Sequence, residues 1–128
     1  MLYFQIKEWQ WRLDSYLPDP FNRIGQWVAK AELLVSSHDV PEVMNDEAAR
    51  ILNSKIEEHK QFFADLPRIQ SEFNSALQLP VVNSVPTEQL QSLARRLDAI
   101  PPLALKRAIK LKFLEHKVSL SWVKFMLE

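Results

Sequence analysis

The stretch ARILNSKIEEHKQFFADLPRIQSEFNSAL, residues 49–77, decides the fold because its apolar residues recur every three or four positions. Seven of the nine positions in this repeat are apolar, and the nine are Ala49, Leu52, Ile56, His59, Phe63, Leu66, Gln70, Phe73 and Leu77. Such spacing is typical of the a and d positions of a coiled coil. It predicts a helix from about residue 45 to residue 77, roughly 45 to 50 Å long at 1.5 Å per residue. Pro67 predicts a kink in this helix, between residues 62 and 67, and not its end, because the repeat continues in phase.

Two further segments have the same spacing and could pack against this helix. One is predicted to run from about residue 20 to residue 36, with Asp19 as its N-cap and Pro20 as its first residue. The other is predicted to run from Thr87 to about residue 127, interrupted at Pro101 and restarted at Pro102. The segments between them are expected to be loops, and Asn45 is expected to cap the central helix.

The N-terminal residues form a separate short segment. Apolar residues at heptad spacing from Leu2 to Tyr16 predict a helix there, and the sequence Leu17-Pro18-Asp19-Pro20 ends it. We therefore divide the chain into an N-terminal helical segment or linker, residues 1–17, and one domain, residues 18–128. The predicted fold class is all-α, an antiparallel three-helix coiled-coil bundle with an extra N-terminal helical segment.

The composition excludes several classes of protein. The chain has 128 residues, eight prolines, one glycine and no cysteine. A single glycine argues against a β-rich fold and against a glycine-rich phosphate loop, and the lack of cysteine rules out disulfides and thiolate metal sites. A net charge of zero argues against a nucleic-acid-binding protein. No apolar run is long enough to cross a membrane, and no signal peptide is expected.

No group of residues in the sequence predicts an enzyme, a cofactor or a metal site. Ser37, His38 and Asp39 are the residue types of a hydrolase triad, but neighbours in a loop cannot form its relay, so a solvated loop is expected. His59 and His116 each lack a second metal ligand at suitable spacing. His59 lies within the heptad pattern, where burial would lower the pKa of its ring.

Two features of the sequence are candidate interaction sites. Lys106, Lys110 and Lys117 recur at helical spacing and predict a basic stripe that could meet an acidic partner or remain solvated. Aromatic residues also gather near both ends of the chain, where exposed apolar side chains would mark an interface with a neighbouring segment. These residues are Trp9, Trp11, Trp122 and Phe125.

The segment IGQWVAKAELL, residues 24–34, resembles the first helix of a spectrin repeat, in which a tryptophan, here Trp27, packs into the core. IEEHKQF, residues 56–62, is similar to the second helix of that family. The third helix departs from the family pattern, because Leu97 and Ile100 stand where a second tryptophan is usual and two prolines follow. The resemblance covers about residues 20–117. Within the family, the sequence is most similar to divergent repeats of the nesprins, which are linkers between the nuclear envelope and the cytoskeleton.

This resemblance implies a non-enzymatic scaffold repeat in a large cytoskeletal linker that connects actin with the nuclear envelope. The implied partners are neighbouring repeats of the same chain and actin or an actin regulator such as a formin, with no nucleic acid and no membrane insertion. The implied place is the cytoplasm, at the cytoplasmic face of the outer nuclear membrane. The alternative is a stand-alone helical adaptor that binds a partner helix or peptide in a groove.

Overall fold

The computed structural model describes residue 10, residues 12–41 and residues 45–127, with side chains as far as residue 118. This part of the chain is all-helical, as predicted, and contains no β-strand. Its elements are α2 (Phe21–Val35), α3 (Asp46–Phe63), α4 (Leu66–Ala76), the 3₁₀ helix η1 (Pro80–Ser84) and α5 (Thr87–Leu127).

The start of α2 differs from the prediction. Pro20 is the N-cap, without a side-chain cap, so the expected N-cap at Asp19 is wrong. Asn22 ties the helix to the residues before it, because its backbone N–H donates to the Pro18 carbonyl at 3.2 Å and its side-chain amide donates to the Ser15 carbonyl at 2.7 Å. The first turn of α2 is therefore held by the chain ahead of the proline break.

The predicted helix over residues 45–77 is divided into α3 and α4, with a turn at Ala64 and Asp65 where a kink was expected. The ring nitrogen of Pro67 has no N–H to donate to the Phe63 carbonyl, which favours a break at this point. The Asn45 side chain caps α3 as predicted, accepting a hydrogen bond from the Ala48 N–H at 2.9 Å.

The turn also changes which residues of α4 face the core. The buried residues of α4 are Ile69, Phe73 and Ala76, whereas Gln70 and Leu77 are only half-buried. The predicted heptad pattern is therefore correct for Leu52, Ile56 and His59 of α3 and for Phe73 of α4. At two other places after the break, the buried residue lies one position before the predicted one: Ile69 in place of Gln70, and Ala76 in place of Leu77.

The helix α5 is continuous through Pro101 and Pro102, so the predicted interruption is wrong. Each proline removes one backbone hydrogen bond of the helix, but packing continues in phase on both sides of the pair. Buried residues recur along one face of α5: Leu93, Leu97, Ile100, Ala104, Arg107, Leu111, Leu114 and Val118. This unbroken alternation of four and three residues places one continuous helix against the other elements.

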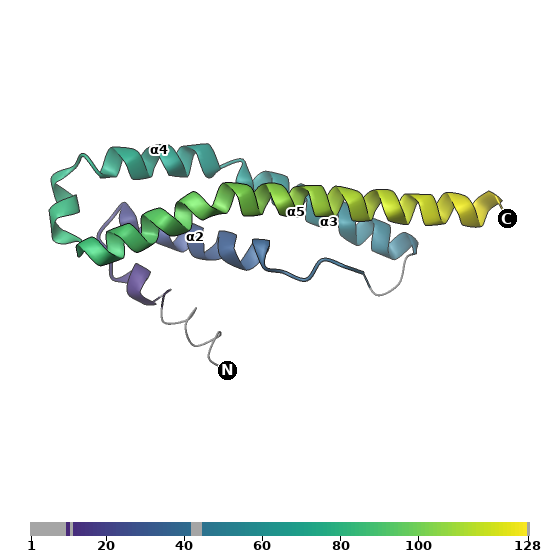
Figure 1. Cartoon of the computed structure of the whole chain (residues 1–128), viewed down its shortest axis with the longest axis horizontal. Coiled ribbons are helices and arrows are strands. Elements are labelled where there is room, and N and C mark those ends of the chain that lie inside the picture. Colours follow the sequence, from purple (N-terminus) through teal and green to yellow (C-terminus); the bar gives the residue numbers. More distant parts are fainter. Residues whose placement is uncertain (1–9, 11, 42–44, 128) are drawn as a thin grey trace.

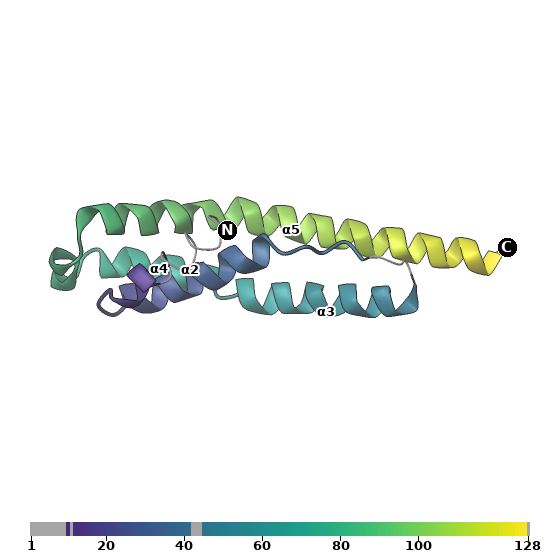
Figure 2. The ribbon, with the colours of Figure 1, turned by 90° about the horizontal axis from the view of Figure 1, so that it is seen from below.

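The molecule is an elongated rod built along α5 (Figure 1). The helices α2 and α4 lie beside the first half of α5, and α3 lies beside its second half. The helices α3 and α4 run in the direction opposite to α2 and α5 (Figure 2). Three helices are therefore side by side only in the first half, while α3 and α5 share the second half with an extended connecting segment, residues 36–41.

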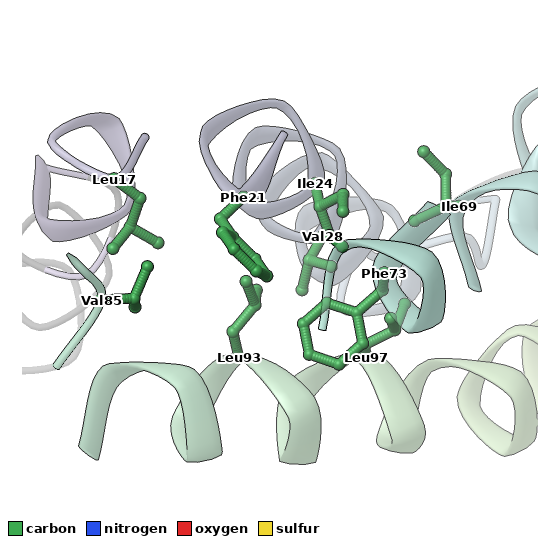
Figure 3. Packing of buried hydrophobic residues seen from close by; sticks show 10 residues of the cluster. Leu17, Phe21, Ile24, Val28, Ile69, Phe73, Val85, Leu93 and Leu97 are labelled. Carbon is green, nitrogen blue, oxygen red and sulfur yellow. The ribbon is translucent and has the colours of Figure 1, made fainter. Parts of the chain in front are cut away.

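The hydrophobic core is divided in the same way. In the first half, ten buried residues from α2, α4, α5 and the adjoining loops form one cluster, in which Phe21 meets Phe73 edge to face at 6.1 Å (Figure 3). In the second half, a smaller cluster joins Leu52 and Ile56 of α3 to three residues of α5, which are Leu111, Leu114 and Val118. The two halves thus differ in the size of their cores.

Leu17 belongs to the larger cluster although it precedes the proline break. Asp14 and Leu17 are therefore buried against the domain that follows them, whereas Tyr16 between them is exposed. The boundary between residues 17 and 18 stays a prediction.

Candidate functional site

The connecting segment, residues 36–41, occupies the space between α3 and α5 that a longer α2 would fill (Figure 2). Its Asp39 is 3% exposed, so the carboxylate is buried between the two helices. The expected solvated loop is wrong for this residue, although Ser37 and His38 beside it are exposed. A buried carboxylate requires a charged or hydrogen-bonding partner, and α5 supplies it.

Arg107 of α5 binds both Asp39 and His59 in the interior. Its Nε and Nη2 donate to the two carboxylate oxygens of Asp39 at 3.1 and 3.3 Å, and its Nη1 lies 2.9 Å from His59 Nδ1. Lys55 of α3 adds a further ion pair to Asp39 at 3.4 Å, and the Ser37 hydroxyl donates to Asp39 at 3.1 Å. This cluster, which we call the Arg107 cluster, fastens the connecting segment to α3 and α5.

The cluster determines the charge of His59. Burial and the neighbouring Arg107 charge lower the pKa of His59 below its usual value, and a hydrogen bond to the Ala104 carbonyl and the charge of Asp39 only partly oppose this. A neutral imidazole has one nitrogen without a proton, and with Nδ1 in that state it accepts from Arg107 Nη1. The folded protein therefore holds His59 neutral.

The same cluster keeps Asp39 ionised. Burial alone would raise the pKa of Asp39, but the hydrogen bonds and charge of Arg107, with help from Ser37 and Lys55, outweigh burial and lower that pKa. A bidentate guanidinium–carboxylate pair of this kind is strong because both donors and both acceptors are matched in geometry.

Acid should destabilise the protein in two stages. Because the pKa of His59 is lower in the folded chain than its unfolded value of about 6.5, the unfolded state binds more protons as the pH falls below about 7. The free energy of unfolding should then decrease until the pH passes the folded pKa of His59. The lowered pKa of Asp39 adds stability above about pH 4, which is lost as the pH falls through its folded value. Thermal melts from pH 8 to 3 measure both stages.

His59→Asn provides the test of the first stage, because an asparagine oxygen can accept from Arg107 but cannot titrate in this range. We expect the variant to lose the decrease in melting temperature that begins below about pH 7. The matched control is His116→Asn at an exposed position of α5. If His59→Asn keeps the full acid dependence and His116→Asn removes it, the assignment to His59 is wrong.

A second arginine of α5, Arg96, binds carboxylates in the first half of the rod. Arg96 Nη1 pairs with the buried carboxylate of Asp14 at 2.8 Å, and its Nη2 pairs with Glu32 of α2 at 2.6 Å. These hydrogen bonds and charges raise the pKa of Arg96 against the opposing effect of burial. Arg96 and Arg107 are eleven residues apart, close to three helical turns, so both point to the same face of α5.

Gly25, the single glycine of the chain, is explained by this arrangement. A Cβ atom at position 25 would lie 2.8 Å from the Cβ of Asp14, closer than packed carbon atoms approach. The absence of a side chain on this face of α2 therefore allows Asp14 to reach Arg96.

The structure describes the side chains of only some of the residues that were predicted as interaction sites. Lys106, Lys110 and Lys117 are all exposed on α5 and form a stripe, whereas Arg107, which lies in the same basic run, is buried. Trp9 and Trp11 lie outside the described residues, as do the side chains of Trp122 and Phe125. Whether these residues bind a partner stays a prediction.

A hollow of about 50 Å³ lies between α3 and α5, lined by Ile56, His59 and Leu111 among others, and has room for little more than water. Among the described residues, no group of three or more His, Asp or Glu side chains could hold a metal ion. No described helix is both long and apolar enough to span a bilayer.

Comparison with known proteins relates the chain to two very long proteins. It is 49% identical over 119 residues, 93% of its length, to Muscle-specific protein 300 kDa of Drosophila melanogaster. It is 30% identical over 73 residues, 56% of its length, to Nuclear anchorage protein 1 of Caenorhabditis elegans. The chain spans about 1% of the length of each relative. No family model and no solved structure matches it.

Proposed function

We propose that this chain is one spectrin-like repeat of a large cytoskeletal linker, which connects the actin cytoskeleton with the nuclear envelope through protein–protein contacts. The observation that carries the proposal is the 49% identity, over nearly the whole chain, to about 1% of a muscle protein. A piece so small within a chain so long is the relation expected of one module in an extended array. The second relative, named for nuclear anchorage, supports a place at the nuclear envelope.

The architecture supports a mechanical role. The elements run up, down and up along the rod, in the order expected of an antiparallel three-helix repeat. The first helix is shortened and completed by the connecting segment, and the second is divided between α3 and α4. In this proposal Arg96 holds the residues before α2 to α5, and Arg107 holds the connecting segment to α5. The second half of α5 runs past the beginning of α3, which offers a neighbouring repeat a helix to pack against (Figure 1).

The proposed partners are neighbouring repeats and actin or an actin regulator such as a formin, at the cytoplasmic face of the outer nuclear membrane. The exposed lysines of α5 would meet the acidic surface of the partner. No enzymatic activity and no cofactor are proposed.

Reversing Lys106, Lys110 and Lys117 to Glu should abolish co-sedimentation with actin filaments at low salt, because the attraction depends on the sign of the stripe. Raising the salt concentration should weaken wild-type binding in the same assay. The matched control reverses Lys30, Arg50 and Lys60, three exposed residues of α2 and α3, with the same change in net charge. If wild type does not co-sediment, actin is excluded as the direct partner of this repeat.

The alternative proposal is a stand-alone adaptor for a partner helix. Three of the large apolar side chains exposed on α5 favour the binding of a partner helix, and they are the basis of the inference that follows.

A further inference from the structure

The side of α5 that faces away from the core bears a line of exposed apolar residues. Leu105, Ile109 and Phe113 are 62%, 61% and 64% exposed and lie four residues apart, so they form one ridge roughly 12 Å long. The outer face of a helix on a globular protein is ordinarily polar. Thus α5 carries one apolar line inside the rod and a second line outside it.

The outer line continues in the sequence with heptad spacing. From Ile109 the positions at intervals of four and three residues are 113, 116, 120, 123 and 127, which are Phe, His, Leu, Val and Leu. The backbone remains helical to Leu127. Single exposed hydrophobic residues need no explanation, but a heptad line on a continuous helix is typical of a seam with another helix.

The charges around the ridge are of one sign. At 100° per residue, Lys106, Lys110 and Lys117 lie along one side of it, and Lys112 lies near the other. Between residues 101 and 118 the exposed charged residues are these four lysines, because Arg107 is buried in its cluster and Glu115 is half-buried beside Lys112. A second copy docked on the same face would bring lysines against lysines.

We propose that this outer face of α5 docks an amphipathic helix of another protein whose apolar stripe is flanked by Glu or Asp. The narrow ridge fits the seam of a two-helix contact, in which flanking residues of opposite sign select the partner. A helix that lies in a bilayer surface needs a broader apolar face than this line of single residues. The inference deepens the proposed function by naming the partner chemistry of the lysine stripe.

The test uses two synthetic three-heptad helices with leucine at a and d positions. One has glutamate at the e and g positions and the other has lysine there. Measured by fluorescence anisotropy at physiological salt, the acidic peptide should bind the full chain at least about tenfold more tightly than the basic one. Ile109→Glu/Phe113→Glu should abolish binding of the acidic peptide. Both residues are exposed, so this variant should melt like wild type.

The matched control is Leu33→Glu/Ile51→Glu, which places the same charges at exposed apolar positions of α2 and α3 and should bind like wild type. Equal binding of both peptides, or of neither, overturns the proposal. Binding to phosphatidylserine vesicles that Ile109→Glu/Phe113→Glu removes assigns the face to a membrane and overturns it. Self-association in sedimentation that the same variant removes assigns it to a second copy and also overturns it. The peptide assay contains no actin, so failure of actin binding leaves its result independent.

Discussion

Replacing Arg107 with methionine should lower the free energy of unfolding by about 3 to 5 kcal/mol. Methionine has nearly the length of the arginine stem, so the cavity left behind is small. The cost arises because Asp39, 3% exposed, would lose its main partner and remain as a buried charge. His59 Nδ1 would lose its donor in the same step. Urea denaturation monitored by circular dichroism measures the change.

A double variant separates the cost of the unpaired charge from the value of the pair. Arg107→Met/Asp39→Leu removes both charges, and we expect it to recover much of the lost stability, because an apolar replacement of a buried ion pair is often neutral. Lys106→Met changes the adjacent exposed residue and should stay within about 0.5 kcal/mol of wild type. If Arg107→Met also stays within that range, Arg107 does not anchor the connecting segment.

The sequence contained only half of this cluster. The periodicity of the third helix includes Arg107 as a weak member, and His59 lies within the central heptad pattern, so both are placed near the core by spacing alone. Asp39 has no such signal, because it lies in a loop and its partner is 68 residues away. Periodicity along the chain does not predict a contact between residues so far apart in sequence. A charged loop residue is also ordinarily exposed.

Local sequence also does not determine where the helices break. A single proline, Pro67, divides the predicted central helix, whereas two adjacent prolines leave α5 continuous. What differs is the support from packing: buried residues of α5 keep heptad phase through residues 100 to 104, while the buried face shifts between α3 and α4. Proline lowers the stability of any helix interior, and tertiary contacts determine whether the helix continues.

The outer apolar line of α5 is present in the sequence, but spacing alone does not separate it from the inner line. Assigning the apolar residues of this helix to one seam accounts for Leu111, Leu114 and Val118, and leaves Ile109 and Phe113 unexplained. A helix with two apolar lines has little polar face left to identify it as a surface helix. The structure separates the two lines by their burial.

Phe21→Ala should cost about 3 to 5 kcal/mol, more than the same change at Trp27. Phe21 is fully buried, meets Phe73 edge to face at 6.1 Å and belongs to the ten-residue cluster that joins α2, α4 and α5. The resemblance to spectrin repeats implied that Trp27 is the core aromatic residue of the first helix. In the structure Trp27 is half-buried and stacks on Phe62 at 4.9 Å, at the margin of that cluster.

We therefore expect Trp27→Ala to cost about 2 kcal/mol, because a partly exposed ring loses less apolar burial and leaves less of an internal cavity. Its buried Nε1 has no hydrogen-bond partner among the described residues, so removing it sacrifices no hydrogen bond there. Urea denaturation of both variants gives the comparison, with Phe21→Leu as a control that keeps most of the buried volume. A larger loss of stability for Trp27→Ala than for Phe21→Ala would contradict this ranking. Trp27 would then be the main core residue of α2, and its contacts with Phe62 and Phe63 would contribute more than the contact of Phe21 with Phe73.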